Sequence, residues 1–254
     1  MMKLQALLFD CDGVLAETER DGHRVAYNRA MQDAGISEQW SPEEYAELVR
    51  ISGGKERLRF FFEKNPEKFP PDIFGRDMIE NIYSSKTVIF KEMVQEGLLL
   101  PRTGILRLIT EAHEKNVLLF VCSTSHRESV ETLIRKNYGD TCFGWFAGVF
   151  CGDIVARKKP APDIYILAAE KHSLQPDRCC VIEDSRNGLL AAKNAGMHCV
   201  ITRSYYTAGE DFSEADLVVS SLGDPGGERS EISADSPAAA GQGYISIADI
   251  DILL

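Results

Sequence analysis

Six short apolar runs constrain the fold more than any other feature of this sequence. Each run is continuous rather than alternating with polar residues, which is typical of strands covered on both faces of a sheet. From residue 117 onward the runs alternate with helix-like patterns, which indicates a parallel α/β arrangement. The runs span residues 4–9, 117–122, 146–151, 179–182, 198–202 and 217–220.

A long stretch without strand character separates the first two runs. Helix-period patterns dominate it between about residue 15 and residue 97. A connection of about 80 residues is too long for an ordinary loop. We therefore predict an α/β core domain formed by residues 1–15 and 98–254, interrupted by a helical domain at residues 16–97.

Three segments carry the signals of a helix start. The sequences "SPEE" at 41–44 and "SHRE" at 125–128 have the pattern of capping boxes, and Pro42 suits the first helical position. Ser185 follows an apolar run and is predicted to cap a helix that ends near Gly196.

Composition narrows the class of protein. Acidic residues outnumber basic ones by 39 to 28, a net charge of −11, which argues against nucleic-acid and anionic-membrane partners. No apolar run approaches the roughly 20 residues that span a bilayer. The seven cysteines include no C-x-x-C pair, which argues against a structural zinc site. Several lie inside apolar runs as buried free cysteines do, and their odd number suggests a reducing compartment. We predict a cytoplasmic monomer, with a plastid stroma after removal of a transit segment as the alternative.

Asp10 and Asp12 follow the first apolar run directly, in the sequence "LLFDCDGV". An Asp-x-Asp-Gly segment also occurs in ordinary turns. A calcium-binding EF-hand loop is excluded because Val14 and Leu15 occupy positions where oxygen ligands are needed. A magnesium-assisted nucleophile at the end of a strand is the remaining functional interpretation.

Three further polar segments follow predicted strands or open predicted helices. Each also has a purely structural interpretation: a helix cap for "VCSTS", a solvated basic turn for "RKKPAPD" and a second helix cap for "VIEDS". Together, at the carboxyl ends of parallel strands, they indicate one shared site. The residues are Ser123 and Thr124 in "VCSTS", Lys159 in "RKKPAPD", and Glu183 and Asp184 in "VIEDS".

These four segments resemble, in order, the four motifs of the haloacid dehalogenase (HAD) superfamily: DxDGV, a strand-end Ser/Thr, a Lys before Pro, and ED. The helical insertion after the first motif resembles the helical cap of that superfamily. Within it, "ETE" at 17–19, "GGKER" at 53–57 and "KKPAPDIY" at 158–165 resemble the CbbY branch. That branch is related to β-phosphoglucomutase and includes xylulose-1,5-bisphosphate phosphatases.

The resemblance implies an α/β fold with a HAD-like Rossmannoid parallel sheet and an inserted helical cap domain. It also implies that Asp10 is the nucleophile and forms an aspartyl-phosphate, while Asp12 protonates the leaving oxygen and then activates water. Mg²⁺ would be held by Asp10, the Asp12 backbone carbonyl and Asp184, with Glu183 as a direct or outer ligand. Lys159 and the Ser123 and Thr124 amides would cradle the phosphoryl oxygens.

Residues of the predicted cap domain and its entry would supply selectivity. Lys55 and Arg57 follow a Gly-Gly pair and could hold a second phosphate, although the same segment also has the pattern of a solvated amphipathic helix. The candidates for substrate contacts are Glu17, His23, Lys55, Arg57 and Lys86.

The sequence thus predicts an Mg²⁺-dependent sugar-phosphate phosphatase, acting on xylulose 1,5-bisphosphate or a similar pentulose bisphosphate. A phosphomutase of the β-phosphoglucomutase type is the alternative, because it would use the same aspartyl-phosphate. A non-catalytic binding module is disfavoured, since none of Asp10, Asp12, Lys159 and Asp184 is replaced. The expected partner is a small phosphorylated sugar.

Overall fold

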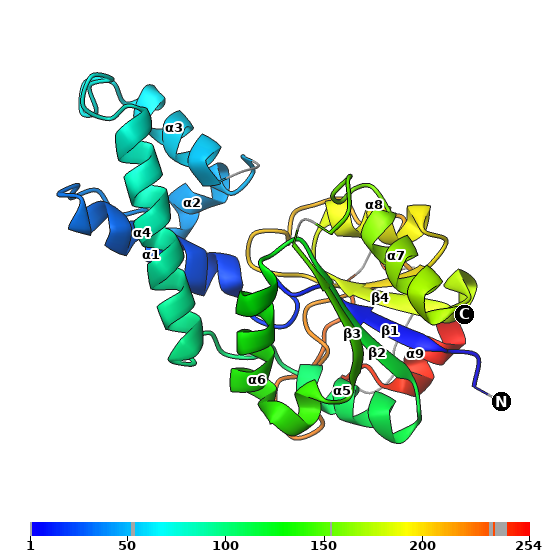
Figure 1. Cartoon of the computed structure of the whole chain (residues 1–254). Coiled ribbons are helices and arrows are strands. Elements are labelled where there is room, and N and C mark those ends of the chain that lie inside the picture. Colours follow the sequence, from blue (N-terminus) through cyan, green and yellow to red (C-terminus); the bar gives the residue numbers. More distant parts are fainter. Residues whose placement is uncertain (1, 52–53, 153, 234–235, 237–242) are drawn as a thin grey trace. The chain divides into compact units, whose positions relative to one another are not determined.

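The computed structural model describes residues 2–51, 54–152, 154–233, 236 and 243–254. The chain divides into two compact units, Met1–Glu17 with Leu100–Leu254, and Thr18–Leu99 (Figure 1). These boundaries lie two residues from the predicted ones at 15/16 and 97/98.

The first unit contains a six-stranded sheet in which every strand pairs in parallel, in the order β3-β2-β1-β4-β5-β6. The predicted α/β class is therefore confirmed. The observed strands begin and end within two residues of the predicted runs. They are β1 (Ala6–Phe9), β2 (Leu118–Ser123), β3 (Phe146–Cys151), β4 (Cys179–Glu183), β5 (His198–Thr202) and β6 (Leu217–Val219).

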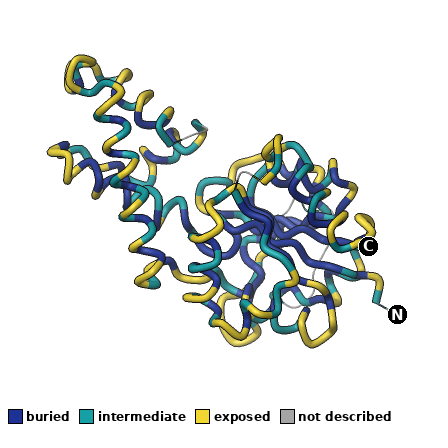
Figure 2. The backbone as a smooth tube through the Cα atoms, in the orientation of Figure 1, coloured by how far each residue is buried: buried dark blue, intermediate teal, exposed yellow. Residues whose placement is uncertain are grey.

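Helices cover both faces of this sheet, which explains the continuous apolar runs. One face packs against α7 (Asp163–His172) and α8 (Arg186–Asn194), and α5 (Ile105–Glu114) contacts α6 (Arg127–Phe143) and α9 (Ile247–Leu253) (Figure 1). A single 3₁₀ turn, Pro176–Arg178, precedes β4. Apart from the edge strand β3, the strands are accordingly buried along most of their length (Figure 2).

The regular secondary structure of the second unit consists of helices alone, with no strand among its described residues. Ser41 and Glu44 form the predicted capping box, with Pro42 at the first helical position. Aromatic side chains, including those of Trp40 and Tyr27, fill much of its interior. Its elements are a π-helical turn (Thr18–His23), α1 (Arg24–Asp33), α2 (Pro42–Leu48), α3 (Gly54–Lys64) and α4 (Arg76–Gln95).

Of the other two predicted helix starts, one is confirmed and one is wrong. The Ser185 hydroxyl accepts a hydrogen bond from Gly188 N at 3.1 Å, and α8 ends two residues before Gly196, which has a φ of +76°. By contrast, α6 begins after His126, which makes no side-chain capping bond. Ser125 does not cap that helix because its hydroxyl donates a hydrogen bond to Asp12 instead.

All seven cysteines are buried and none forms a disulfide. Among the helices of the described residues, none has the length and apolar character needed to cross a bilayer.

Candidate active site

The four predicted motifs converge at the carboxyl edge of the central strands. Asp10 follows β1, Ser123 ends β2, and Glu183 ends β4, with Asp184 next. Strands β2, β1 and β4 are neighbours. The chain runs from β1 to β2 and β3 on one side of β1 and then crosses to β4, β5 and β6 on the other side. Such a reversal point is where open α/β sheets bind ligands.

Lys159 joins two carboxylates of this cluster. Its Nζ donates to Asp10 Oδ1 and to Glu183 Oε1, each at 2.6 Å, and to the Cys122 carbonyl at 3.0 Å. The lysine and glutamate side chains are 8% and 1% exposed, so water screens these ion pairs little. Lys159 therefore fixes the position of the Asp10 carboxylate relative to the end of β4.

Glu183 is held by donors at both of its oxygens. Besides Lys159, Oε1 accepts the Tyr165 hydroxyl at 3.1 Å, and Oε2 accepts the N–H groups of Asp184 and Ser185 and the Ser185 hydroxyl at 3.0–3.2 Å. The adjacent α8 can approach this closely because Gly188 has no side chain; a Cβ there would collide with the carboxylate. This arrangement favours an outer, positioning role for Glu183 over direct metal ligation.

Asp12 is half-buried and accepts a hydrogen bond from the Ser125 hydroxyl. Ser125 N in turn donates to Ser123 Oγ at 3.1 Å, and Ser123 is buried, whereas Thr124 is exposed. Sequence reasoning missed the contact of Ser125 with the site. The sequence does show a third hydroxyl in "VCSTS", that of Ser125. The capping-box pattern, however, predicted that this hydroxyl caps the following helix.

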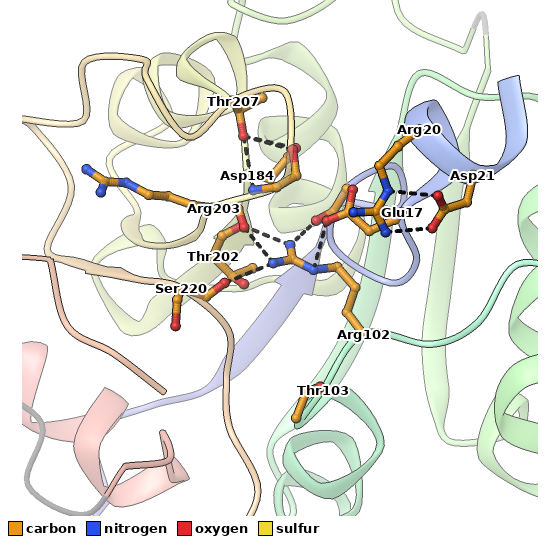
Figure 3. Close-up of polar contacts among 12 residues, drawn as sticks. Glu17, Arg20, Asp21, Arg102, Thr103, Asp184, Thr202, Arg203, Thr207 and Ser220 are labelled. Carbon is orange, nitrogen blue, oxygen red and sulfur yellow. Dashed lines mark hydrogen bonds and ion pairs between the residues drawn. The ribbon is translucent and has the colours of Figure 1, made fainter. Parts of the chain in front are cut away.

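Asp184 completes the cluster. Its side chain, that of Asp10 and that of Glu183 each offer one oxygen, and these three atoms lie within 4.8 Å of one another. The Thr207 hydroxyl lies 3.5 Å from Asp184 Oδ2 (Figure 3). Closely grouped carboxylate oxygens suit a hard divalent cation.

The electrostatics of the site also fit a cation. Burial, with smaller contributions from Glu183 and Asp12, raises the pKa of Asp10 to about 7 despite the opposing effect of Lys159. Burial and the neighbouring Glu183 and Asp10 raise the pKa of Asp184 well above its usual range. Lys159 alone therefore does not balance the buried negative charge, and a divalent metal ion would neutralise the excess.

The predicted substrate contacts at the domain entry have protein partners. Glu17 belongs to the first unit, where its carboxylate lies 3.5 Å from Arg102. His23 lies in the second unit with its ring centre 3.9 Å from that of Phe90. Burial lowers the pKa of His23 well below its usual value, so the ring is neutral near pH 7.

The three predicted cations of the second unit differ in exposure. Lys55 is part-exposed and pairs with Glu80. Arg57 is buried, donates to the Tyr45 hydroxyl and lies 3.5 Å from Glu19. Lys86 is buried with its Nζ 5.0 Å from the Tyr27 ring centre. Gly53 of the Gly-Gly pair lies outside the described residues.

These pKa shifts predict how metal and pH act together on stability. Asp10 and Asp184 bind protons more tightly when folded than when unfolded, so without metal the free energy of unfolding falls as pH rises through about 7. The lowered pKa of Glu183 acts only below the usual carboxylate range, outside this window. A cation that replaces the protons should stabilise more at about pH 8 than at about pH 6.

Thermal melts in chelator and in excess Mg²⁺ at both pH values would measure this. At a hundredfold excess over Kd the gain is about 2.7 kcal/mol, or several degrees in Tm for a chain of this size. Asp184→Asn should lose the gain. Asp216→Asn should keep it, because Asp216 pairs with Lys193 and His198 at the start of β6. An equal gain at both pH values would contradict the assignment.

Comparison with known proteins agrees with this geometry. The model of the haloacid dehalogenase-like hydrolases matches residues 4–196. A CBBY-like protein of Arabidopsis thaliana is 43% identical over 230 residues, which are 89% of this chain and 72% of the relative. Protein CbbY of Cereibacter sphaeroides is 39% identical over 227 residues, 88% of this chain and 95% of the relative.

A solved structure is similar over most of the chain as well. It is a mutant CbbY from Rhodobacter sphaeroides in complex with xylulose 1,5-bisphosphate, 39% identical, with a TM-score of 0.73, covering 89% of this chain and 97% of that one. The predicted class of enzyme, a phosphatase, is thereby confirmed. From its motifs, its fold and these relatives, the chain belongs to the haloacid dehalogenase-like hydrolase family and is similar to its CbbY proteins.

Proposed function

We propose that this phosphatase is Mg²⁺-dependent, acts on a pentulose bisphosphate of the xylulose 1,5-bisphosphate type and works through an aspartyl-phosphate. The observation that supports this most is the Lys159 ammonium between Asp10 and Glu183, with Asp184 beside them. A carboxylate in contact with a fixed cation is well suited to meet a phosphate dianion, because the cation offsets their repulsion.

The proposed reaction has two steps. In the first, an Asp10 oxygen forms a bond to phosphorus as the bond from phosphorus to the sugar oxygen breaks, and Asp12 gives its proton to that oxygen. In the second, Asp12 takes a proton from water, whose oxygen attacks phosphorus and releases inorganic phosphate and Asp10. The contact of Asp12 with Ser125 supports this role, since the hydrogen bond from the Ser125 hydroxyl orients the Asp12 carboxylate.

The metal would be held by the carboxylates of Asp10 and Asp184 and by the Asp12 carbonyl. When bound, it supplies positive charge that offsets the phosphoryl oxygens and the buried carboxylates. Lys159 and the N–H groups of Ser123 and Thr124 would bind the remaining phosphoryl oxygens.

The proposed substrate class rests on the CbbY relative solved with xylulose 1,5-bisphosphate. A bisphosphate needs cations away from the reacting centre, and Lys55 and Arg57 are the candidates for them in the second unit. Lys55 is the more accessible of the two, with 37% of its side chain exposed against 9% for Arg57. Glu17 and His23 are candidates for sugar contacts, and Lys86 is a further cation. Cytoplasm and plastid stroma both remain predictions.

A substrate comparison tests the proposal. The protein is incubated with Mg²⁺ and xylulose 1,5-bisphosphate, ribulose 1,5-bisphosphate, xylulose 5-phosphate, or β-glucose 1-phosphate with its bisphosphate activator. We expect free phosphate, released fastest from xylulose 1,5-bisphosphate. Glucose 6-phosphate without free phosphate would instead establish the mutase, and no turnover of any bisphosphate would contradict the proposed substrate class.

A further inference from the structure

Arg102 is a mostly buried arginine whose guanidinium donates to four backbone carbonyls near the site. Figure 3 shows it beside Glu17, Thr202, Arg203 and Ser220. It donates to the carbonyl of Gly13, to those of Thr202 and Ser220 at 3.0 Å each, and to that of Arg203 at 2.6 Å. Its side chain is 10% exposed and lies 3.5 Å from Glu17. No motif of the sequence analysis included it.

Three of these carbonyls belong to two segments that contact Asp184, and the fourth, that of Ser220, follows β6. Gly13 directly follows Asp12, and its backbone at φ +78° packs so close to Asp184 that a Cβ would collide with the carboxylate. Thr202 and Arg203 lead from β5 into the loop that contains Ser204 and Thr207.

That loop also contacts Asp184. The Thr207 hydroxyl lies 2.9 Å from the Ser204 hydroxyl and 3.5 Å from Asp184 Oδ2. Arg102 therefore binds, through one guanidinium, both backbone segments that border this carboxylate.

An arginine suits this task better than a lysine would. Its planar fork presents five donors in fixed directions, whereas an ammonium on a flexible stem cannot hold four carbonyls at once. Removing a charge from water costs free energy unless the charge is well hydrogen-bonded or paired. The four carbonyls and Glu17 offset that cost for Arg102, which lies where the chain has to hold the metal carboxylate of Asp184.

We propose that Arg102 is a positioning residue for the metal site: it holds the Gly13 turn and the Thr202–Thr207 loop so that the Asp184 carboxylate is oriented for a divalent cation. This inference rests on the proposed function and adds to it a residue outside the four motifs.

Arg107 provides a matched control in the same unit. It is also a mostly buried arginine, with 20% of its side chain exposed, and donates to the carbonyls of Leu222 and Gly223 at 3.0 and 2.9 Å. Its ion-pair partners are Glu111 and Asp224, neither of which belongs to the group of carboxylates Asp10, Glu183 and Asp184. Replacing it removes comparable bonds without touching either segment that borders Asp184.

The test compares Arg102→Met, Arg102→Lys and Arg107→Met with the unaltered protein. Mn²⁺ binding is measured by electron paramagnetic resonance without substrate, and Tm and phosphate release are recorded alongside. Removing groups that orient metal ligands costs about 10–100-fold in metal affinity, so we expect the Mn²⁺ Kd to rise by that factor in Arg102→Met. Arg107→Met should have a lower Tm than the unaltered protein and an unchanged Mn²⁺ Kd.

An unchanged Kd in Arg102→Met, or an equal rise in Arg107→Met, would overturn the inference. If Arg102→Met does not fold, the Mn²⁺ Kd of Arg102→Lys is compared with that of Arg107→Met instead. Lysine keeps the positive charge and the aliphatic chain but lacks the planar guanidinium group. A failure of the proposed function would give a different result. In that case the unaltered protein would bind Mn²⁺ without releasing phosphate from the sugar bisphosphates.

Discussion

Asp10→Asn is expected to lower kcat by about 10⁴-fold or more, since losing a nucleophile removes most of the rate enhancement. The amide of asparagine has no charged oxygen to form the bond to phosphorus. The change is otherwise small in volume and leaves Lys159 paired with Glu183. Phosphate release from the sugar bisphosphate measures the loss. Mass spectrometry of acid-quenched protein should find one added phosphoryl group in the unaltered enzyme and none in the variant.

Stability distinguishes this loss from unfolding. Because burial raises the pKa of Asp10, its charged form is unfavourable in the metal-free fold at about pH 8. Asp10→Asn removes that charge, so its Tm in chelator should equal or exceed that of the unaltered protein. Asp216→Asn, at the opposite edge of the sheet, should lose Tm and keep kcat. Retained turnover in Asp10→Asn would remove Asp10 as the nucleophile.

The sequence predicted the sheet well because local pattern and tertiary environment agree there. Strands covered on both faces must be continuously apolar, and the polar residue that ends each run marks the carboxyl edge. That is why Asp10, Ser123 and Glu183 could be placed at one edge from the sequence. The helical unit was predictable for a similar reason, since the Ser41 capping box and the helix-period patterns are local signals.

The residues that orient the site were not predictable in the same way. Ser125 has the sequence pattern of a cap, but the carboxylate of Asp12, which follows β1 more than a hundred positions earlier, accepts its hydroxyl hydrogen instead. Arg102 has no local pattern at all, because its partners come from three distant segments. Their roles arise from contacts that form only when the sheet is assembled.

The cations of the helical unit show a further limit. From the sequence, Lys55 and Arg57 could either bind a second phosphate group or belong to a solvated amphipathic helix. The structure adds their acidic partners, Glu80 and Glu19. A second phosphate would therefore compete with a carboxylate at each cation, and only a comparison of mono- with bisphosphorylated sugars separates these roles.

Asp12→Ala is expected to lower kcat/KM for a sugar phosphate by about 10²–10⁴-fold, the usual contribution of a positioned acid or base. A sugar alkoxide is a poor leaving group and needs the proton of Asp12, whereas p-nitrophenolate leaves without one. The first step should therefore be nearly preserved with p-nitrophenyl phosphate. The second step lacks its base with either substrate.

The variant should consequently release one equivalent of p-nitrophenolate per site in a burst and then stall with Asp10 phosphorylated. Stopped-flow absorbance measures the burst, and Asp10→Asn should show none. Ser125→Ala keeps the Asp12 carboxylate and removes only the hydrogen bond from the Ser125 hydroxyl. Its kcat/KM should therefore fall less than that of Asp12→Ala, and it should show no burst of p-nitrophenolate. The Mn²⁺ Kd of Asp12→Ala should stay near the unaltered value, because the proposed ligand is a backbone carbonyl. Equal losses on both substrates with no burst would mean that Asp12 moves no proton in the reaction.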